Sequence, residues 1–254
     1  MSQLFRFAIQ LMRYRKAAAR TLKSAARDFY YNELSRMAIE AGSDKGFPGH
    51  GYTRIYEHFF HDKREKITSL LEVGLLRHAI QNRLHRNIYD IAPSLVMWRK
   101  YFKNANIYGF DIRDFSDVEI EGCTIIQGDQ SSRSDLVKIF DHAKNFDVII
   151  DDALHASLHQ QITLSFLFPS LNPDGLFFIE DLNYQPPTSD GTLLFPTTLS
   201  LLKNFMWTGI WNSPVATEDE KKYFEQNVKS IDFFDSLAGA RKGKSDDLAV
   251  IKKG

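Results

Sequence analysis

The sequence predicts an α/β protein with a mostly parallel sheet, a C-terminal antiparallel hairpin and an N-terminal helical extension. Three observations support this fold class. Short apolar runs alternate with helical segments over residues 68–182, which is typical of parallel strands buried on both faces. Strand-like runs at 230–236 and 247–253 flank a turn rich in Gly, Lys and Ser, so we expect a hairpin with no helix in it. Residues 2 to about 40 have few helix breakers and many Ala, Leu, Arg and Lys.

The expected elements of the sheet region follow one another as strand, helix and strand. The expected strands are 68–74, 106–112, 123–129, 146–152 and 175–182. The expected helices are 94–102, with Ser94 as N-cap, 134–144 and 158–171.

The glycine-rich break at 42–52 divides the chain into a basic helical extension, 1–41, and a main domain, 42–254. Residues 1–27 hold seven basic side chains and no acidic one: Arg6, Arg13, Arg15, Lys16, Arg20, Lys23 and Arg27. Three interpretations of this helix stay open: a self-association seam, which we favour; a helix on an anionic membrane surface; and a plain covering helix. We expect a cytoplasmic homo-oligomer, with peripheral contact at the inner membrane surface through 1–27 as the alternative.

Composition excludes several classes of protein. The single cysteine, Cys123, excludes an intramolecular disulfide and a cysteine-rich zinc site. No apolar run is long enough to span a bilayer, and Arg6 interrupts the apolar N-terminal stretch, so we expect no signal peptide. Beyond the basic extension the chain is net acidic, so we expect no nucleic-acid partner.

Every expected strand delivers polar side chains to the same edge of the sheet, where doubly wound sheets bind their ligands. In chain order these residues are Glu72 and Gly74, Asp111, Asp129 and Gln130, Asp151 and Asp152, and Glu180 and Asp181. One such carboxylate is often only a turn or cap residue, but five strand ends together favour a binding site.

The second and third strand ends suit a nucleoside. Asp111 is placed to accept hydrogen bonds from a ribose diol. Asp129 and Gln130 are placed to meet the exocyclic amine of an adenine.

The fourth and fifth strand ends suit a hard metal ion. Asp152, Glu180 and Asp181 offer oxygen ligands from adjacent strands, which magnesium and calcium prefer. His155, three residues beyond Asp152, is expected to act as a base beside the metal, whereas His159 is the weaker candidate.

A resemblance to a known family is carried, in order and spacing, by "SDKGFPGHGYTRIYEHFF", "LLEVG", "LVMWRKYFKNANIYGFDI", "IIQGDQSS", "FDVIIDDALHAS" and "LFPSLNPDGLFFIEDL". These segments resemble the class I S-adenosylmethionine-dependent methyltransferases, and most of all the metal-dependent sugar O-methyltransferases of the macrocin and mycinamicin type. The resemblance covers roughly residues 42–185. It implies a Rossmann-like class I methyltransferase sheet for 42–254.

The resemblance also implies roles at the matching positions. Asp152 matches a metal ligand of catalytic importance, which Glu180 and Asp181 complete, and His155 matches the general base.

For the donor, Asp111 matches the ribose acid, while Asp129 and Gln130 match the adenine side. The segment 42–52 matches a lid over the donor, together with the end of the first strand. It therefore adds these donor-binding residues: Asp44, Lys45, Tyr52, Glu72 and Gly74, with His50 and Tyr56 beside them.

The loop after the first strand departs from the family pattern, because no glycine occurs between Gly74 and Gly109. Class I methyltransferases place several glycines there for close approach to the donor. Either the insert 75–93 folds over the donor as a basic lid, or donor binding is weakened or lost. Its basic side chains, Arg77, His78, His85 and Arg86, suit an anionic substrate or form a solvated helix face.

The expected function is S-adenosylmethionine-dependent, Mg²⁺-assisted methylation of a sugar hydroxyl on a glycan or glycosylated natural product. A small-molecule or glycan acceptor is the expected partner, and 186–214 is expected to line its site. The alternatives are methylation of a nitrogen or a phenolic oxygen, and a degenerate binding protein without catalysis.

Overall fold

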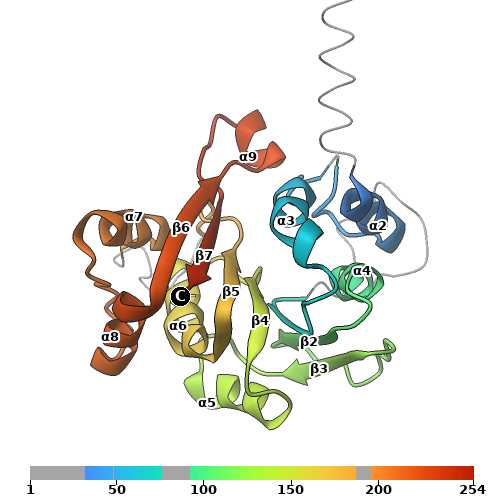
Figure 1. Ribbon diagram of the computed structural model, residues 1–254, viewed down its shortest axis with the longest axis horizontal. Coiled ribbons are helices and arrows are strands. Elements are labelled where there is room, and N and C mark those ends of the chain that lie inside the picture. Colours follow the sequence, from blue (N-terminus) through green and yellow to red (C-terminus); the bar gives the residue numbers. More distant parts are fainter. Residues whose placement is uncertain (1–31, 48, 76–91, 187–195) are drawn as a thin grey trace, which may run out of the picture.

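The computed structural model of the chain describes residues 32–47, 49–75, 92–186 and 196–254 (Figure 1). The predictions made for residues 1–27 lie outside the described residues. So do the basic side chains of 76–91.

The described residues form one seven-stranded sheet in the order β3-β2-β1-β4-β5-β7-β6. Its strands are β1 Ser69–Val73, β2 Asn106–Asp111, β3 Cys123–Gln127, β4 Phe146–Asp151, β5 Leu171–Ile179, β6 Val228–Phe234 and β7 Leu248–Lys253. Strands β1 to β5 pair in parallel, and β7 is antiparallel to both β5 and β6. The mostly parallel sheet with a C-terminal antiparallel hairpin is therefore confirmed.

The helices are α2 Glu33–Ala41, α3 Thr53–Phe60, α4 Pro93–Tyr101, α5 Arg133–Leu136, α6 Ser157–Leu167, α7 Thr198–Thr208, α8 Glu218–Asn227 and α9 Leu237–Arg241. Short 3₁₀ turns are η1 His61–Lys63, η3 Val137–Asp141 and η4 Phe168–Ser170. None of the helices in the described ranges is long and apolar enough to cross a bilayer.

Two expectations about the helices were wrong: the N-cap of α4 and the absence of a helix in the hairpin. Helix α4 begins at Pro93 with Ala92 as its N-cap, which frees Ser94 to line the pocket described below. A helix, α9, does lie between β6 and β7. The Ser236 side chain caps it by accepting a 2.7 Å hydrogen bond from the Gly239 amide, so a sequence rich in turn residues still closes one helical turn.

Helices cover both faces of the sheet, which gives three layers (Figure 1). Helices α2, α3 and α4 pack on one face, and α5, α6, α7 and α8 pack on the other. Neighbouring residues of β4 divide between the two faces: Val148 and Ile150 join the first core, and Ile149 joins the second. This two-sided burial explains the apolar runs in β4 and in the second half of β5.

The last nine residues of the N-terminal extension, α2, pack with the main domain. Leu34 and Ala38 are fully buried in the same cluster as Tyr56 and Trp98. Gly42 ends the helix in a left-handed conformation, φ +83°. The glycine-rich break is thus a change of chain direction at Gly42, and the packing continues across it.

Gly74 brings the ends of β1, β2 and β4 close together. Its amide donates to the Phe110 carbonyl at 2.8 Å, and the Asp152 amide donates to the Val73 carbonyl at 2.9 Å. Gly74 has φ +96°, and a Cβ there would overlap the backbone of Asp152 and Ala153. Glycine is therefore required both for the backbone conformation and for the close approach of two strand ends.

Gly74→Ala should lower the free energy of unfolding by about 3 kcal/mol, because it adds steric overlap to an unfavourable φ. Gly209→Ala is the matched control. Gly209 has φ +69°, yet no atom of the described residues lies within 4 Å of the added methyl group, so its cost should be about 1 kcal/mol. Urea denaturation of both variants measures the difference, and equal losses would contradict the close approach at Gly74.

Candidate active site

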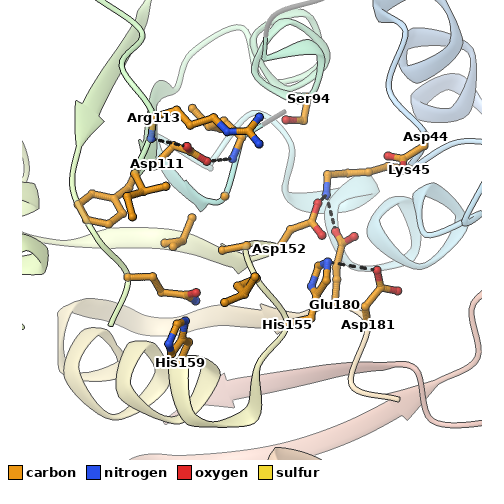
Figure 2. Close-up of a pocket in the computed structure, with 18 of the residues that line it drawn as sticks. Asp44, Lys45, Ser94, Asp111, Arg113, Asp152, His155, His159, Glu180 and Asp181 are labelled. Atoms are coloured by element: carbon orange, nitrogen blue, oxygen red, sulfur yellow. Dashed lines mark hydrogen bonds and ion pairs between the residues drawn. The ribbon is translucent and has the colours of Figure 1, made fainter. Parts of the chain in front are cut away.

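A pocket of about 580 Å³ opens at the carboxyl ends of β1, β2 and β4 (Figure 2). The strand order reverses between β1 and β4, which is where doubly wound sheets bind ligands. Its volume lies within the range of small-molecule sites. The predicted residues that line it are Asp44, Lys45, Gly74, Asp111, Asp129, Gln130, Asp152, His155, Glu180 and Asp181.

Two predicted donor-binding residues, Tyr52 and Glu72, lie behind this lining. Both are fully buried. Their side chains contact the residues that line the pocket, so the structure gives them a supporting position.

Asp111 connects two strand ends on one side of the pocket (Figure 2). Its Oδ2 accepts from the Leu75 amide at 2.7 Å and its Oδ1 accepts from the Arg113 amide at 2.8 Å. Each carboxylate oxygen can accept a further hydrogen bond. Asp111 therefore holds the chain after β1 in place and still presents acceptors to the pocket.

The loop after β3 places Asp129 and Gln130 side by side but in different roles. Asp129 Oδ1 accepts from the amide and the hydroxyl of Ser131, at 2.8 and 2.7 Å. Gln130 Nε2 donates to the buried Asp151 at 2.7 Å. Among the described residues nothing donates to Gln130 Oε1, although this oxygen is buried. Gln130 itself lines the pocket, so this acceptor lies beside it.

The two aspartates at the end of β4 differ in their access to the pocket. Asp151 is buried behind the pocket, and its burial raises its pKa to about 7 against the opposing effect of the Gln130 hydrogen bond. Asp152 lines the pocket. Only the second aspartate of the pair is available to a ligand.

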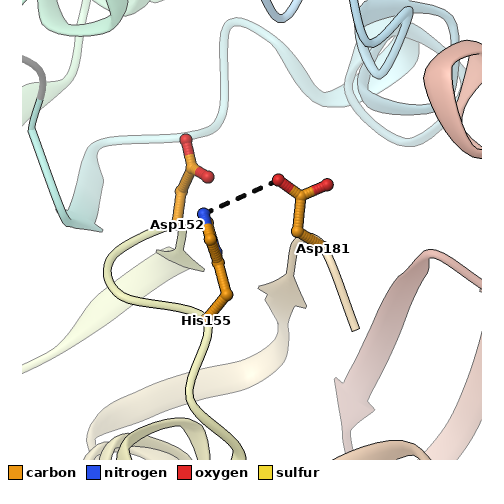
Figure 3. Close-up of side chains that lie close together, drawn as sticks. All are labelled: Asp152, His155 and Asp181. Carbon is orange, nitrogen blue, oxygen red and sulfur yellow. Dashed lines mark ion pairs between the residues drawn. The ribbon is translucent and has the colours of Figure 1, made fainter. Parts of the chain in front are cut away.

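Asp152, His155 and Asp181 gather into one group beside the pocket (Figure 3). One ligand atom from each lies within 4.8 Å of the others, and His155 Nε2 is 3.6 Å from Asp181 Oδ2. Two carboxylate oxygens and one imidazole nitrogen form a donor set that suits a divalent cation.

Two members of this group have an unusual backbone conformation. His155 and Asp181 have φ +63° and +53°, in the left-handed region that side chains other than glycine rarely adopt. Such conformations cost free energy and concentrate at functional sites.

Glu180, the third predicted metal ligand, is turned away from this group. Its Oε1 accepts from the Lys45 ammonium at 2.7 Å and from the Tyr56 hydroxyl. Burial raises the pKa of Glu180, and the neighbouring Asp152 raises it further. The structure thus brings Asp152 and Asp181 together with His155 and not with Glu180.

Lys45 lies at the bottom of the site, although the sequence places it in a segment expected to cover the donor. Its ammonium is buried among three carboxylates: it pairs with Asp152, with Glu180 at 2.7 Å and with Glu72 at 3.3 Å. Burial opposes the charge, but these carboxylates outweigh it and hold the pKa of Lys45 well above its usual value.

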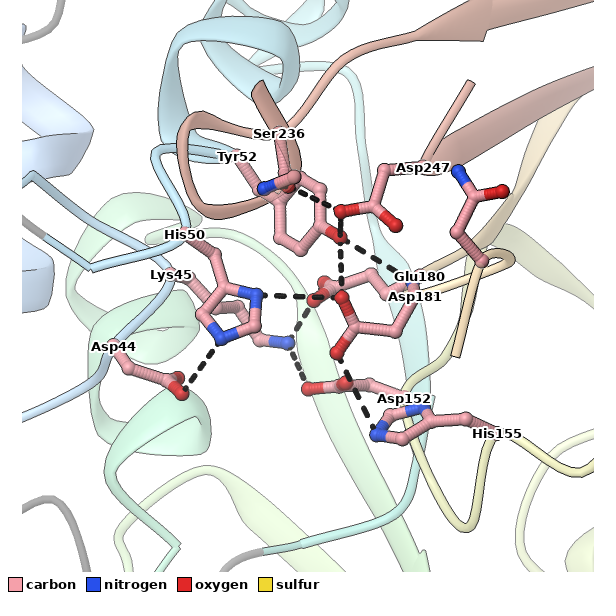
Figure 4. Close-up of polar contacts among 12 residues, drawn as sticks. Asp44, Lys45, His50, Tyr52, Asp152, His155, Glu180, Asp181, Ser236 and Asp247 are labelled. Atoms are coloured by element: carbon pink, nitrogen blue, oxygen red, sulfur yellow. Dashed lines mark hydrogen bonds and ion pairs between the residues drawn. The ribbon is translucent and has the colours of Figure 1, made fainter. Parts of the chain in front are cut away.

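His50 supplies a second cation from the same segment (Figure 4). Its Nδ1 is 3.3 Å from Asp181 Oδ1 and its Nε2 is 3.6 Å from Asp44 Oδ2. Burial lowers the pKa of His50, but the hydrogen bond and charge of Asp181 and the charge of Asp44 raise it to about 9.

Tyr52 connects Asp181 to the C-terminal hairpin (Figure 4). Its hydroxyl donates to Asp181 Oδ1 at 2.7 Å and lies 3.3 Å from Asp247 Oδ2, which also accepts from the Ser236 hydroxyl. Sequence reasoning missed Ser236 and Asp247, because they lie far along the chain outside every recognisable motif. Only the pairing of β6 with β7 brings them to the site.

The segment 186–214, expected to line the acceptor site, does not border this pocket in its described residues. Trp211 is fully buried, and its indole donates to the Ser165 hydroxyl at 3.1 Å. Trp211 therefore packs against α6, whereas Trp207 of the same segment is exposed.

The raised pKa of His50 predicts a pH dependence of stability. A group whose pKa is higher in the folded state than its usual 6.5 stabilises the fold fully below pH 6.5, and this contribution disappears as the pH rises through 9. In chelator, the melting temperature of the wild type should therefore exceed that of His50→Gln at pH 6, and the gap should close between pH 6.5 and 9. A gap that is constant over this range would contradict the charged contact between His50 and Asp181.

Curated proteins and solved structures give a consistent set of relatives, whereas no family model matches the chain. Mycinamicin VI 2''-O-methyltransferase of Micromonospora griseorubida is 30% identical over 210 residues, which cover 79% of this chain and 50% of that protein. The 8-demethyl-8-alpha-L-rhamnosyl tetracenomycin-C 2'-O-methyltransferase of Streptomyces olivaceus is 35% identical over 159 residues, 60% of this chain and 39% of that protein. The chain thus spans about half the length of the first relative and less of the second.

Among solved structures, the MycE methyltransferase from the mycinamycin biosynthetic pathway, in complex with Mg and SAH, matches with a TM-score of 0.66 at 28% identity. The match covers 88% of this chain and 55% of that protein. Another structure of MycE contains Mg, SAH and mycinamycin VI. This chain has the class I S-adenosylmethionine-dependent methyltransferase fold and resembles the macrocin- and mycinamicin-type sugar O-methyltransferases.

Proposed function

We propose that the chain is an S-adenosylmethionine-dependent, Mg²⁺-assisted O-methyltransferase that acts on a sugar hydroxyl of a glycosylated natural product or glycan. The observation that carries the proposal is the group of Asp152, His155 and Asp181 at the pocket where the strand order reverses. The names of the relatives support the reaction, and the Mg and SAH of the MycE complex support the cofactors.

The pocket wall suits the donor. Asp111 would accept from the ribose hydroxyls, and Gln130 Oε1, with Asp129 beside it, would accept from the adenine amine. Gly74 lies between these residues and Asp152, at the position where the methionine part would lie. The buried acceptor on Gln130 is the strongest of these observations. A buried polar atom without a partner destabilises the protein, and a hydrogen bond from the ligand would remove this cost.

The metal would be held by Asp152 and Asp181, with Glu180 nearby, and His155 would stay off the metal so that its Nε2 can act as the base. Bound there, the cation would lower the pKa of the acceptor hydroxyl. Two carboxylates that follow the adjacent strands β4 and β5 define one side of the site, so the acceptor oxygen would be fixed relative to the donor pocket.

His155 would take the proton of the acceptor. A new bond forms between the acceptor oxygen and the methyl carbon, the bond from that carbon to sulfur breaks, and the sulfonium leaves as a neutral thioether. The hydroxyl proton goes to His155 Nε2, the nitrogen that faces Asp181 at 3.6 Å. The sulfonium is already activated, so alignment of the oxygen with it is the main task of the protein.

The acceptor would lie against apolar side chains that flank His155. The Tyr184 ring meets the His155 ring edge to face at 5.8 Å and is 47% exposed. Leu154 lines the pocket and is 48% exposed. Exposed apolar faces beside a polar centre suit a sugar ring, whose C–H bonds pack on them while its hydroxyls face the metal.

The remaining parts of the proposal rest on the sequence alone: the cytoplasmic location on the single cysteine, and the other two on the basic extension. They are cytoplasmic location, self-association, and contact of residues 1–27 with the inner membrane surface as the alternative to self-association.

Two measurements test the function. Calorimetric titration of S-adenosylmethionine, with magnesium and again with chelator, should show micromolar binding. Transfer of labelled methyl groups should then be assayed with glycosides that carry free deoxysugar hydroxyls, and should require magnesium. Absence of donor binding under both conditions would reject the methyltransferase and favour a binding protein without catalysis.

His155→Gln should lower turnover by about 10²- to 10⁴-fold and leave donor affinity unchanged, because the side chain would act only on the acceptor proton. His159→Gln is the matched control, since His159 lines the same pocket from the same segment and is assigned no proton transfer. Donor affinity from calorimetry and turnover from the labelled assay separate the two effects. Equal turnover in the two variants would exclude His155 as the base.

Tyr184→Ala should raise KM for the acceptor about fivefold or more without changing donor affinity, because it removes an aromatic face beside His155. Tyr184→Phe keeps that face and should bind the acceptor as the wild type does. If KM for the acceptor rises as much in the phenylalanine variant as in the alanine variant, the hydroxyl and not the ring contributes to acceptor binding.

A further inference from the structure

We propose that the Lys45 ammonium is a built-in counter-ion that occupies two carboxylates of the metal site, so that the divalent ion binds only as Lys45 gives them up. Lys45 would then set the metal affinity of the protein. The inference rests on the metal site of the proposed function.

The contacts of Lys45 place its charge where two neighbouring strands deliver ligands. Residues Asp151 and Ile179 are paired across β4 and β5, so Asp152 and Glu180 are the next residues on adjacent strands. The Lys45 ammonium contacts both of them (Figure 4). A position shared by two carboxylates from adjacent strands is also a position that a divalent cation would favour.

The same contacts explain why Glu180 lies outside the group of Asp152, His155 and Asp181. Its Oε1 accepts from Lys45 and from Tyr56. Asp152 belongs to both sets, because it pairs with Lys45 and lies within reach of His155 and Asp181. Lys45 and a metal ion would therefore compete for Asp152, and the ion would gain Glu180 only from Lys45.

Glu72 is an alternative ion-pair partner for the Lys45 ammonium. It is fully buried, and its Oε1 is 3.3 Å from the ammonium, farther than the contacts to Asp152 and Glu180. The four-carbon stem of lysine is flexible enough to move by this amount. With Lys45 paired to Glu72 alone, the positive charge stays balanced while Asp152 and Glu180 turn to the metal.

Magnesium affinity, measured by calorimetry on the full chain, tests the competition. Lys45→Met should bind Mg²⁺ about tenfold more tightly than the wild type, because the competing charge is gone. Glu72→Gln should bind it several-fold more weakly, since Lys45 loses the partner to which it withdraws. Lys63→Met, which removes an exposed lysine of η1, is the matched control and should leave the affinity unchanged.

Thermal melting provides a second readout. Without metal, Lys45→Met should melt at a lower temperature than the wild type, because it leaves buried carboxylates without their counter-ion. Magnesium should raise its melting temperature by more than it raises that of the wild type. If Lys45→Met does not fold, the double variant Lys45→Met with Glu72→Gln removes one charge of each sign, and it should also bind Mg²⁺ more tightly.

Unchanged or weaker magnesium binding by the folded Lys45 variants would overturn the inference and make Lys45 a fixed support of the site. Absence of magnesium binding in every variant would overturn it as well. Donor binding and methyl transfer by the wild type are measured separately, so failure of the methyltransferase proposal is distinguishable from failure of this one.

Discussion

At the carboxyl edge of the sheet, five carboxyl groups lie close together and largely out of water, and the neighbouring segments are arranged to balance their charge. The five groups are Asp44, Glu72, Asp152, Glu180 and Asp181. Their cations, Lys45 and His50, come from a single segment that follows α2. Buried carboxylates destabilise a fold unless they are paired, so the segment that supplies the cations is bound to the sheet by charge as well as by packing. Burial raises the pKa values of Asp44, Glu72 and Glu180, and the charge of Lys45 opposes this rise in each of them.

This arrangement separates two tasks. Asp151, Glu72 and Tyr52 are buried behind the pocket and hold the residues in front of them. Asp152 and Asp181 line the pocket, where a ligand could reach them. The Tyr52 hydroxyl donates to the Asp181 side chain and accepts from the Asp181 amide at 3.3 Å, so a supporting residue holds the unusual backbone of a ligand position.

The sequence was sufficient for the sheet because its central strands β1, β4 and β5 are largely buried on both faces, which produces apolar runs that can be recognised in the sequence. It was also sufficient to place Asp111, Asp129, Asp152 and Asp181 at one edge, because parallel strands end on the same side. It was not sufficient for α9, which is a single helical turn within a stretch of turn residues. Nor could it assign Lys45 and Glu180, because a choice among several carboxylates depends on distances that only the packed segment defines. The pairing of Tyr52 with Asp247 spans 195 positions and follows from no local pattern.

The hydrogen bonds that join the C-terminal hairpin to the site have a consequence for how the protein reaches its working state. The Leu237 amide donates to the His50 carbonyl at 2.6 Å, and Asp247 lies beside the Tyr52 hydroxyl. Contacts between such distant positions form late, because the loop entropy must be overcome first. A ribosome-bound chain would therefore assemble the parallel strands before it could fix His50 and Tyr52 over them. Competence to bind a ligand would therefore be acquired only after β7 has paired with β5 and β6.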